Sequence, residues 1–507
     1  MAILQVDKAD KDGSSTSENY SGEGTDSSPY IVEFRYEDPG NPMNFSPSKK
    51  WFIIFIVTLS VFAVTLTSSA YSGSANEILM QFHCSTELFA LGISLYVLGF
   101  AIGPALWAPL SELYGRKILF VTTHTCMVAF VAASAGANSM AALLVFRFLT
   151  GMFGASPLTN SGGVIADMFP ATHRGLAMIF FCNAPFMGPV LGPIIGGFIS
   201  MNVGWRWVQG VCSIFIGVVW IAGSIFVPET YGPVILQKRA AKLSRETGNI
   251  YTTAFQQRHS TLTPSDIFRK ALMRPWVLLF REPIVLIAAT YLAILYGTVY
   301  MFMPALPIVY QRGRGWNEGL GGLAFLGLVC GMLVGVVYAI LDDIRYKRLG
   351  KAATPESRLP PAAVGSIALP IGLFAFAWTN SPSIHWGASI ILSAPFGFGC
   401  VLVFLSCLNY LIDSYTIYAA SVLGAAAMLR AFFGTAFPLF TDQMYENIGI
   451  HWASSISGFL TLVCLPFPFV MLEYGEMLRL KCKYAQESAT LMAQMHAQAS
   501  TGSSGDE

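Results

Sequence analysis

Long apolar runs recur along the chain, separated by short polar segments. Each run holds few charges and approaches or exceeds the ~20 residues that a helix needs to cross a bilayer. In lipid only helices and closed barrels satisfy every backbone group, so these runs predict transmembrane helices. The predicted spans are residues 51–72, 88–109, 118–137, 140–162, 175–200, 207–227, 284–308, 318–340, 362–379, 386–411, 416–440 and 452–473.

The order of the runs predicts how the chain is organised. Two groups of six spans, residues 51–227 and 284–474, flank a polar cytosolic loop, residues 228–283. Residues 1–50 are polar and rich in Ser, Gly and acids, which predicts a disordered cytosolic tail. Residues 475–507 form a second cytosolic tail. The expected fold is an all-α membrane protein with twelve transmembrane helices in two six-helix halves.

Composition narrows the class of protein further. Hydrophobic residues make up 54% of the 507 residues and charged residues only 12%, with a net charge of +1. A soluble fold could not bury that much apolar surface and still cover its exterior with polar groups. Near-neutral charge argues against nucleic-acid binding. The nine cysteines are scattered without a CxxC pair, so we expect neither a disulfide framework nor a metal site.

Basic residues predict the orientation in the membrane. If both termini are cytosolic, the outer loops hold only Arg206, Arg312 and Arg314, and nearly all other Lys and Arg residues lie inside. This asymmetry is the one that the positive-inside rule requires. The expected location is a multi-pass position in the plasma membrane, with the vacuolar membrane as an alternative.

The predicted loop between spans 2 and 3 carries a compact charged motif. Its core is Glu112-x-x-Gly115-Arg116-Lys117. A glycine permits a tight turn there, and two basic residues at the membrane interface can pair with acidic groups and helix ends. We interpret this loop as a cytosolic latch that helps to hold one transport state.

Two further motifs lie within spans 4 and 5. Arg147 lies inside span 4, where a charge is costly and must face a cavity or a partner. Span 5 carries glycines four residues apart together with prolines, so one face admits a close neighbour and the helix can bend. The residues of this second motif are Gly188, Gly192, Pro193, Gly196 and Gly197.

Together these motifs resemble the major facilitator superfamily, and specifically its fungal twelve-span drug:proton antiporter branch. Asp167 and Arg174 after span 4, and Pro228-Glu229 after span 6, strengthen the resemblance. It implies the fold of that family and secondary active efflux driven by proton antiport. It further implies that Arg147, Asp167 and Arg174 take part in proton coupling or gating. A monomer without a cofactor is expected, with a small-molecule substrate and protons as partners.

The charges inside the membrane bear on the substrate. No acidic residue falls within a predicted span interior, whereas Arg147 and Arg430 both do. A cationic ligand would need a buried carboxylate to offset its charge. We therefore expect a neutral or anionic amphipathic compound, such as a drug, toxin or secondary metabolite. The alternative role for Arg430 is structural, with backbone carbonyls or Asn409 as its partners.

The substrate cavity is expected to be aromatic with a few polar groups, which suits varied lipophilic ligands. Its candidate residues are Asn160, Asn183, Tyr291, Tyr296, Tyr300, Phe396, Phe404, Phe433 and Arg430. The group that carries the proton is left open between His124, Glu77 and Asp167.

Two alternatives remain within the same fold: a proton-coupled importer, and an exporter of polyamines or cationic drugs. A membrane enzyme is disfavoured, because no catalytic constellation appears at membrane depth. No nucleotide-binding motif of the Gly-x-x-x-x-Gly-Lys-Ser/Thr type is present, so transport is not expected to use ATP directly.

Overall fold

A computed structural model describes residues 20–488 and residue 490, apart from residues 36, 171–173, 260–263, 351–353 and 417. Twelve segments in this part of the chain are long and apolar enough to cross a membrane, as the sequence predicts. Several of these segments combine two or three helices and continue past the predicted boundaries by one to three turns. The polar ends of such helices lie outside the apolar window that hydropathy detects.

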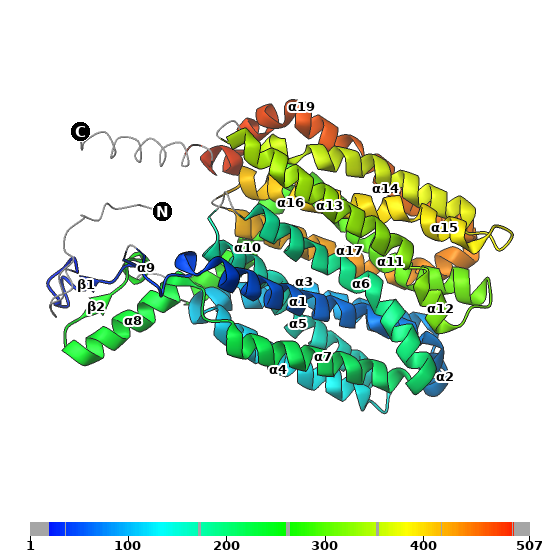
Figure 1. Ribbon diagram of the computed structural model, residues 1–507, viewed down its shortest axis with the longest axis horizontal. Coiled ribbons are helices and arrows are strands. Elements are labelled where there is room, and N and C mark those ends of the chain that lie inside the picture. Colours follow the sequence, from blue (N-terminus) through cyan, green and yellow to red (C-terminus); the bar gives the residue numbers. More distant parts are fainter. Residues whose placement is uncertain are drawn as a thin grey trace.

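The first half contains six spans, and its helices lie together in the lower part of Figure 1. Prolines lie inside α3, α5 and α6, and each removes one backbone hydrogen bond. The helices are α1 (Pro47–Ala70), α2 (Ala75–Phe82), α3 (Thr86–Tyr114), α4 (Arg116–Ala135), α5 (Met140–Met168), α6 (Gly175–Val203) and α7 (Trp205–Phe226).

The second half contains the other six spans, in the upper part of Figure 1. Three of its spans combine helices in series: α12 with α13, α15 with α16, and α18 with α19. The helices are α11 (Pro283–Leu306), α12 (Glu318–Leu323), α13 (Leu326–Leu349), α14 (Pro360–Thr379), α15 (Trp386–Leu392), α16 (Ala394–Ser414), α17 (Ala419–Ile448), α18 (Ile450–Cys464) and α19 (Pro466–Lys481).

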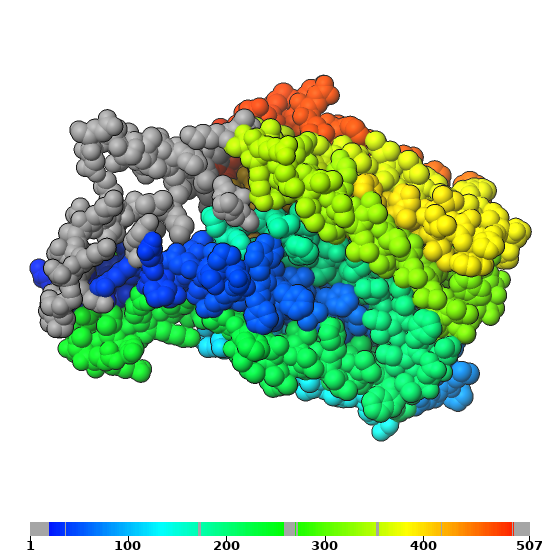
Figure 2. Space-filling model, in the orientation of Figure 1, coloured from blue at the N-terminus to red at the C-terminus, as the bar shows by residue number. Residues whose placement is uncertain are grey.

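Three pairs of helices carry much of the contact between the halves. Helix α6 packs against α12 and α13, and α3 packs against α17. In the space-filling view, α6 lies between α1 and α13 on the face shown (Figure 2). These contacts place α1, α6, α11 and α17 around the centre of the molecule.

The segment before α1 and the loop between the halves differ from the sequence expectation. The loop contains α8 (Gly232–Thr247), β2 (Tyr251–Thr252), α9 (Ala254–His259) and α10 (Pro264–Arg281). From Tyr20 onward the first tail is packed rather than disordered: β1 (Tyr30–Ile31) pairs in parallel with β2. Residues 1–19 of that predicted tail, and most of residues 475–507 beyond residue 488, lie outside the described residues.

Aromatic and charged contacts explain why this segment docks. The rings of Tyr20 and Tyr30 pack on Tyr251 at centroid distances of 5.3 and 5.1 Å. Arg239 of α8 donates to Asp38 at 2.6 Å, and this guanidinium holds the pKa of the Asp38 carboxyl below its ordinary value. We call residues 20–46 the docked segment; its partners are more than 190 residues away, so local composition does not reveal them.

Candidate functional site

Arg147 is enclosed by the first half of the protein. Its side chain is 1% exposed, and its guanidinium donates to three backbone carbonyls: Gly92 of α3 at 3.0 Å, Thr67 of α1 at 3.1 Å and Ser68 of α1 at 2.6 Å. Thr67 and Ser68 lie in the last turn of α1, where carbonyls begin to lose their helical donors and the helix dipole is negative. Arg147 therefore ties α5 to α1 and α3.

Two tyrosine rings complete this enclosure. The guanidinium carbon of Arg147 lies 4.3 Å from the ring centroid of Tyr71 and 4.7 Å from that of Tyr96. Both rings are fully buried. Cation–π contacts in a desolvated site compensate part of the charge, so the cationic side chain is held without a carboxylate.

The glycine repeat of α6 lies against the same turn of α1. A Cβ atom at Gly192 would lie 1.9 Å from Ser69 Oγ, and one at Gly196 would lie 2.1 Å from the Ala70 carbonyl oxygen. A Cβ at Gly188 would meet Thr65 Oγ1 at 2.1 Å. Only glycine fits at such distances, and the two helices are in direct backbone contact. Pro193 and Gly197 of the same motif face α12: Pro193 is beside Gly322, and Gly197 is beside Glu318.

Arg430 of α17 has different surroundings. Its guanidinium carbon lies 4.9 Å from the ring centroid of Phe404 and 5.2 Å from that of Tyr296. Among the described residues, no hydrogen bond or ion pair to this side chain is found, and the side chain retains some exposed surface. The predicted structural partner Asn409 instead lines a crevice near the C-terminal end of α16. Arg430 is thus a cation at membrane depth without a polar partner among the described residues.

Aromatic side chains from three helices surround Arg430. Phe186 of α6 packs edge-on against Phe404 of α16 at 4.6 Å and against Tyr296 of α11 at 5.9 Å. Phe186, which is not among the predicted cavity residues, lies two residues before Gly188, the first glycine of the span 5 motif. An aromatic residue beside a glycine face that packs on a neighbouring helix is a signal that could have identified it.

A chain of hydroxyl groups runs from this cluster to the first half. Tyr296 donates to Tyr300 Oη at 3.4 Å, and Tyr300 Oη lies 2.8 Å from Ser68 Oγ. Ser68 gives its own proton to the Thr65 carbonyl at 2.6 Å, so Ser68 accepts from Tyr300. Each proton in the chain therefore points toward α1, and Ser68 also bears the carbonyl that receives Arg147.

The other predicted cavity residues are more dispersed. Asn160 donates to Ser156 Oγ, and both Asn160 Oδ1 and Asn183 Oδ1 are buried without a hydrogen-bond partner. Tyr291 instead packs against Phe467 of α19, away from the Arg430 cluster. Phe396 stacks on Phe302, and Phe433 packs on Phe437 within α17. The structure therefore brings Tyr296, Tyr300, Phe404 and Arg430 together but leaves Tyr291 elsewhere.

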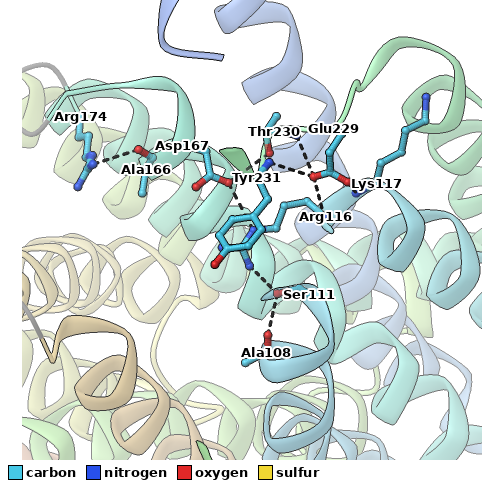
Figure 3. A network of polar contacts seen from close by, with 10 residues as sticks. All are labelled: Ala108, Ser111, Arg116, Lys117, Ala166, Asp167, Arg174, Glu229, Thr230 and Tyr231. Carbon is cyan, nitrogen blue, oxygen red and sulfur yellow. Dashed lines mark hydrogen bonds and ion pairs between the residues drawn. The ribbon is translucent and has the colours of Figure 1, made fainter. Parts of the chain in front are cut away.

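The loop between α3 and α4 forms a charged cluster in the first half (Figure 3). Arg116 contacts Asp167 of α5 at 3.4 Å, and its guanidinium also donates to Ser111. Glu229, after α7, accepts from the backbone amides of Arg116 and Lys117 at 2.9 and 3.2 Å. Figure 3 shows the side chain of Lys117 pointing away from these groups.

The residues of this latch differ partly from the predicted ones. Gly115 has a φ of 99°, a value that favours glycine, and the Glu229 carboxylate fills the space where a Cβ would lie. Glu112, by contrast, is exposed on the last turn of α3. Asp167 pairs with the side chain of Arg116, and Glu229 accepts from its backbone amide.

The second half carries a matching cluster. Arg358, just before α14, contacts Asp413 at the end of α16 at 3.1 Å and Asp343 of α13 at 3.8 Å. Arg116 at the start of α4 and Asp167 near the end of α5 have the equivalent positions in the first half. Asp343 also reaches across the interface, because a Cβ at Gly175 would lie 1.9 Å from its carboxylate. This contact sets the Asp343 carboxylate at the positive N-terminus of α6.

Arg174 lies beside this contact. It donates to the carbonyls of Phe169 at 2.8 Å and Ala166 at 3.0 Å. Desolvation lowers the pKa of Arg174, whereas Asp167 of the first half and Asp413 of the second half raise it. Arg174 thus lies in the field of both charged clusters, at one end of the interface between the halves.

The other two proton-carrier candidates, His124 and Glu77, also make hydrogen bonds. His124 Nδ1 lies 2.8 Å from the Phe120 carbonyl, and its Nε2 lies 2.6 Å from Ser60 Oγ. Since a carbonyl only accepts, Nδ1 carries the proton of a neutral ring and Nε2 accepts from Ser60. Glu77 accepts from the backbone amide of Trp205 at 2.6 Å.

Comparisons with known proteins agree with this architecture. Residues 53–438 match the family model of the Major Facilitator Superfamily. Among solved structures, the chain is similar to the proton:xylose symporter XylE, with a TM-score of 0.60 and 15% identity, covering 84% of this chain and 97% of that chain. At this identity the likeness shows the fold alone.

Curated relatives are much closer in sequence. The chain is 62% identical to the major facilitator-type transporter sorT of Penicillium rubens, over 94% of this chain and 93% of the relative. It is 58% identical to the MFS-type efflux pump MFS2 of Trichophyton rubrum, over 94% and 81%. It is 54% identical to the multidrug transporter mdrA of Aspergillus fumigatus, over 94% and 79%. With its twelve membrane-spanning helices, this chain is a multi-pass membrane transporter that belongs to the major facilitator superfamily.

Proposed function

We propose that the protein is a secondary active exporter that moves small amphipathic organic compounds out of the cytosol in exchange for protons. The observation that carries this proposal is the high identity to proteins named efflux pumps, 58% and 50% over 94% of this chain. The glycine face of α6 supports it, because direct backbone contact with α1 provides a smooth surface for relative motion of helices. The proposed location is the plasma membrane, with both termini cytosolic and a monomeric protein.

The surroundings of the two intramembrane arginines favour neutral or anionic substrates. In the described part of the chain, no carboxylate pairs with Arg147 or Arg430. A polyamine or cationic drug at the Arg430 cluster would meet an uncompensated positive charge in a medium of low dielectric constant. This argument speaks against the cationic-drug alternative.

For proton coupling, we favour Asp167 among the three predicted groups. Its carboxylate joins α5 to α4 through Arg116 and accepts from Thr230 at 3.3 Å. Protonation would weaken the ion pair with Arg116 and loosen the charged cluster of the first half. Asp167→Asn is therefore expected to flatten the pH dependence of export, whereas Glu77→Gln keeps the wild-type profile.

The test uses inside-out vesicles with an acidic lumen. An exporter would carry 2-naphthoate into the lumen as protons leave. Passive distribution of a weak acid runs the other way, because its neutral form permeates and collects on the alkaline side. Accumulation in the acidic lumen that collapses with a protonophore supports proton-coupled export. Loss of preloaded 2-naphthoate from the lumen that is faster than in protein-free vesicles under the same gradient would indicate import and contradict the proposal.

A further inference from the structure

The Arg430 cluster has the features of an anion-binding site that the chain itself leaves unfilled. A guanidinium carries five N–H donors, and burying a charge without partners is costly. Arg147 shows how this fold satisfies such a group when its role is structural: three carbonyls and two rings enclose it. Arg430 has two rings and, among the described residues, no acceptor. Its unused donors point to an acceptor that comes from outside the chain.

The aromatic rings around Arg430 indicate the shape and polarity of the rest of the ligand. Phe404, Tyr296 and Phe186 come from three different helices and contact one another at 4.6 and 5.9 Å. Flat rings in edge-to-face arrangement suit a flat apolar ligand, which can pack on Phe404 while its polar end reaches Arg430.

The hydroxyl chain limits the other donors at the site. Tyr296 gives its proton to Tyr300, and Tyr300 gives its proton to Ser68. The Tyr296 hydroxyl thus has lone pairs but no spare proton for a ligand. The guanidinium of Arg430 remains the donor of the cluster, and it can bind two oxygens of one acid group at the same time.

The geometry points to Arg430 as the residue that binds the acid group of the substrate, with the substrate an aromatic or conjugated organic acid that is anionic at cytosolic pH. This inference rests on the proposed export function and narrows its substrate class. The acid group pairs with the guanidinium, and the planar part of the molecule lies among Phe186, Tyr296 and Phe404. An oxygen near Tyr296 also competes with Tyr300 for the Tyr296 proton, which connects binding to the contact between Tyr300 and Ser68 of the other half.

Two probes that share one ring system test the inference. Equilibrium binding of tritiated 2-naphthoate and of neutral 2-naphthalenemethanol is measured on purified wild-type protein and on Arg430→Gln, Arg430→Lys and Lys238→Gln. Lys238→Gln is the charge-matched control, since Lys238 is an exposed residue of α8. Thermal unfolding of each variant shows that it is folded.

The wild type is expected to bind 2-naphthoate more tightly than the alcohol. In Arg430→Gln the affinity for 2-naphthoate falls about tenfold or more, as expected for a lost charge-assisted hydrogen bond, and the alcohol stays within about twofold. Arg430→Lys retains part of the preference, and Lys238→Gln binds both probes as the wild type does. The inference is overturned if folded Arg430→Gln binds 2-naphthoate normally, if both probes weaken together, or if the wild type binds neither.

Failure here is separable from failure of the export proposal. Proton-coupled export can be measured in the inside-out vesicles with a panel of neutral compounds that does not depend on Arg430. Suppose that a neutral compound is transported by the gradient and that Arg430→Gln binds 2-naphthoate normally. The export proposal would then be supported, and the acid-binding role of Arg430 would be excluded.

Discussion

Arg147 and Arg430 are the same residue type at membrane depth, yet the chain surrounds their guanidinium groups in opposite ways. Arg147 is 1% exposed and gives three hydrogen bonds to backbone carbonyls of α1 and α3. Arg430 lies over the rings of Phe404 and Tyr296, has no hydrogen-bond acceptor among the described residues, and keeps exposed surface. We infer from the difference that an arginine at membrane depth is available to a ligand only when its own chain leaves its N–H donors without acceptors. An arginine whose N–H groups donate to the chain's own carbonyls holds helices together, whereas one whose N–H groups lack such acceptors is available to a ligand.

The largest effect is expected when Arg147 is removed. Arg147→Ala leaves the carbonyls of Gly92, Thr67 and Ser68 without their shared donor and opens a void between Tyr71 and Tyr96. We expect a free energy of unfolding lower by about 3 kcal/mol or more, and loss of transport for every substrate alike. Thermal unfolding in detergent, beside vesicle transport of 2-naphthoate and 2-naphthalenemethanol, measures both. A stable variant that loses transport of 2-naphthoate but still transports 2-naphthalenemethanol would contradict the difference between Arg147 and Arg430.

The turn of α1 that receives Arg147 also contacts the glycine face of α6, so a bulky residue there disturbs the same region. Gly192→Val places a side chain where Ser69 Oγ and the backbone of Ala70 already lie. Overpacking of this kind costs about 1–3 kcal/mol, and we expect export to stop. The matched control is Gly217→Val in α7, where nothing lies within 4 Å of the added Cβ. Equal transport by the two variants would contradict a special role for this contact.

A smaller effect is expected at the link between the two arginines. Tyr300→Phe removes the hydroxyl that joins Tyr296 to Ser68 across the halves. One net hydrogen bond is worth about 1 kcal/mol, so stability should fall little. The freed Tyr296 proton becomes available to a ligand, and we expect tighter binding of 2-naphthoate together with slower export. Binding and export that both stay at wild-type values would show that the hydroxyl chain does not connect the sites.

The smallest effect is expected far from both arginines, at the docked segment. Asp38→Asn removes the contact with Arg239, which is partly exposed, and costs about 1 kcal/mol or less. Because the pKa of Asp38 is lowered below its ordinary value of 3.8, the contribution of the ion pair is complete above that value and disappears as the pH falls below the lowered value.

Hydrogen exchange of residues 20–46 measures this contribution. At neutral pH we expect faster exchange in Asp38→Asn than in the wild type, and equal exchange once the pH lies below the lowered pKa. Binding of 2-naphthoate should be unchanged throughout. A difference in exchange that grows on acidification would contradict the assigned ion pair.

The sequence predicts the spans well because bilayer thickness imposes a minimum apolar length on each helix. It also identifies Arg147 and Arg430, since two basic residues in apolar runs are conspicuous. The sequence does not show which of the two arginines is satisfied by its own chain, because the carbonyls that accept hydrogen bonds from Arg147 come from residues 55 and 80 positions away. Every residue has a backbone carbonyl, so the sequence does not show which carbonyls accept a hydrogen bond from a given side chain. The packing of the helices determines this.

Two other gaps have the same physical origin. Phe186 and Ser68 are not predicted as site residues, because hydropathy does not show whether an aromatic or small polar residue in a membrane helix faces lipid, protein or ligand. The docked segment was expected to be disordered because its composition is polar, and its order depends on Tyr251 and Arg239 of the central loop. Tyr291, in contrast, shares the composition of a cavity residue but packs against Phe467.

The most direct test of the difference between the two arginines is the selectivity of Arg430→Gln in acidic inside-out vesicles. The quantity is the initial rate of 2-naphthoate accumulation divided by that of a neutral compound that the wild type transports. Since Arg430 is expected to bind the acid group without holding the fold, this ratio should fall about tenfold while the rate for the neutral compound persists. A ratio equal to that of the wild type, or equal loss of both rates, would contradict the account.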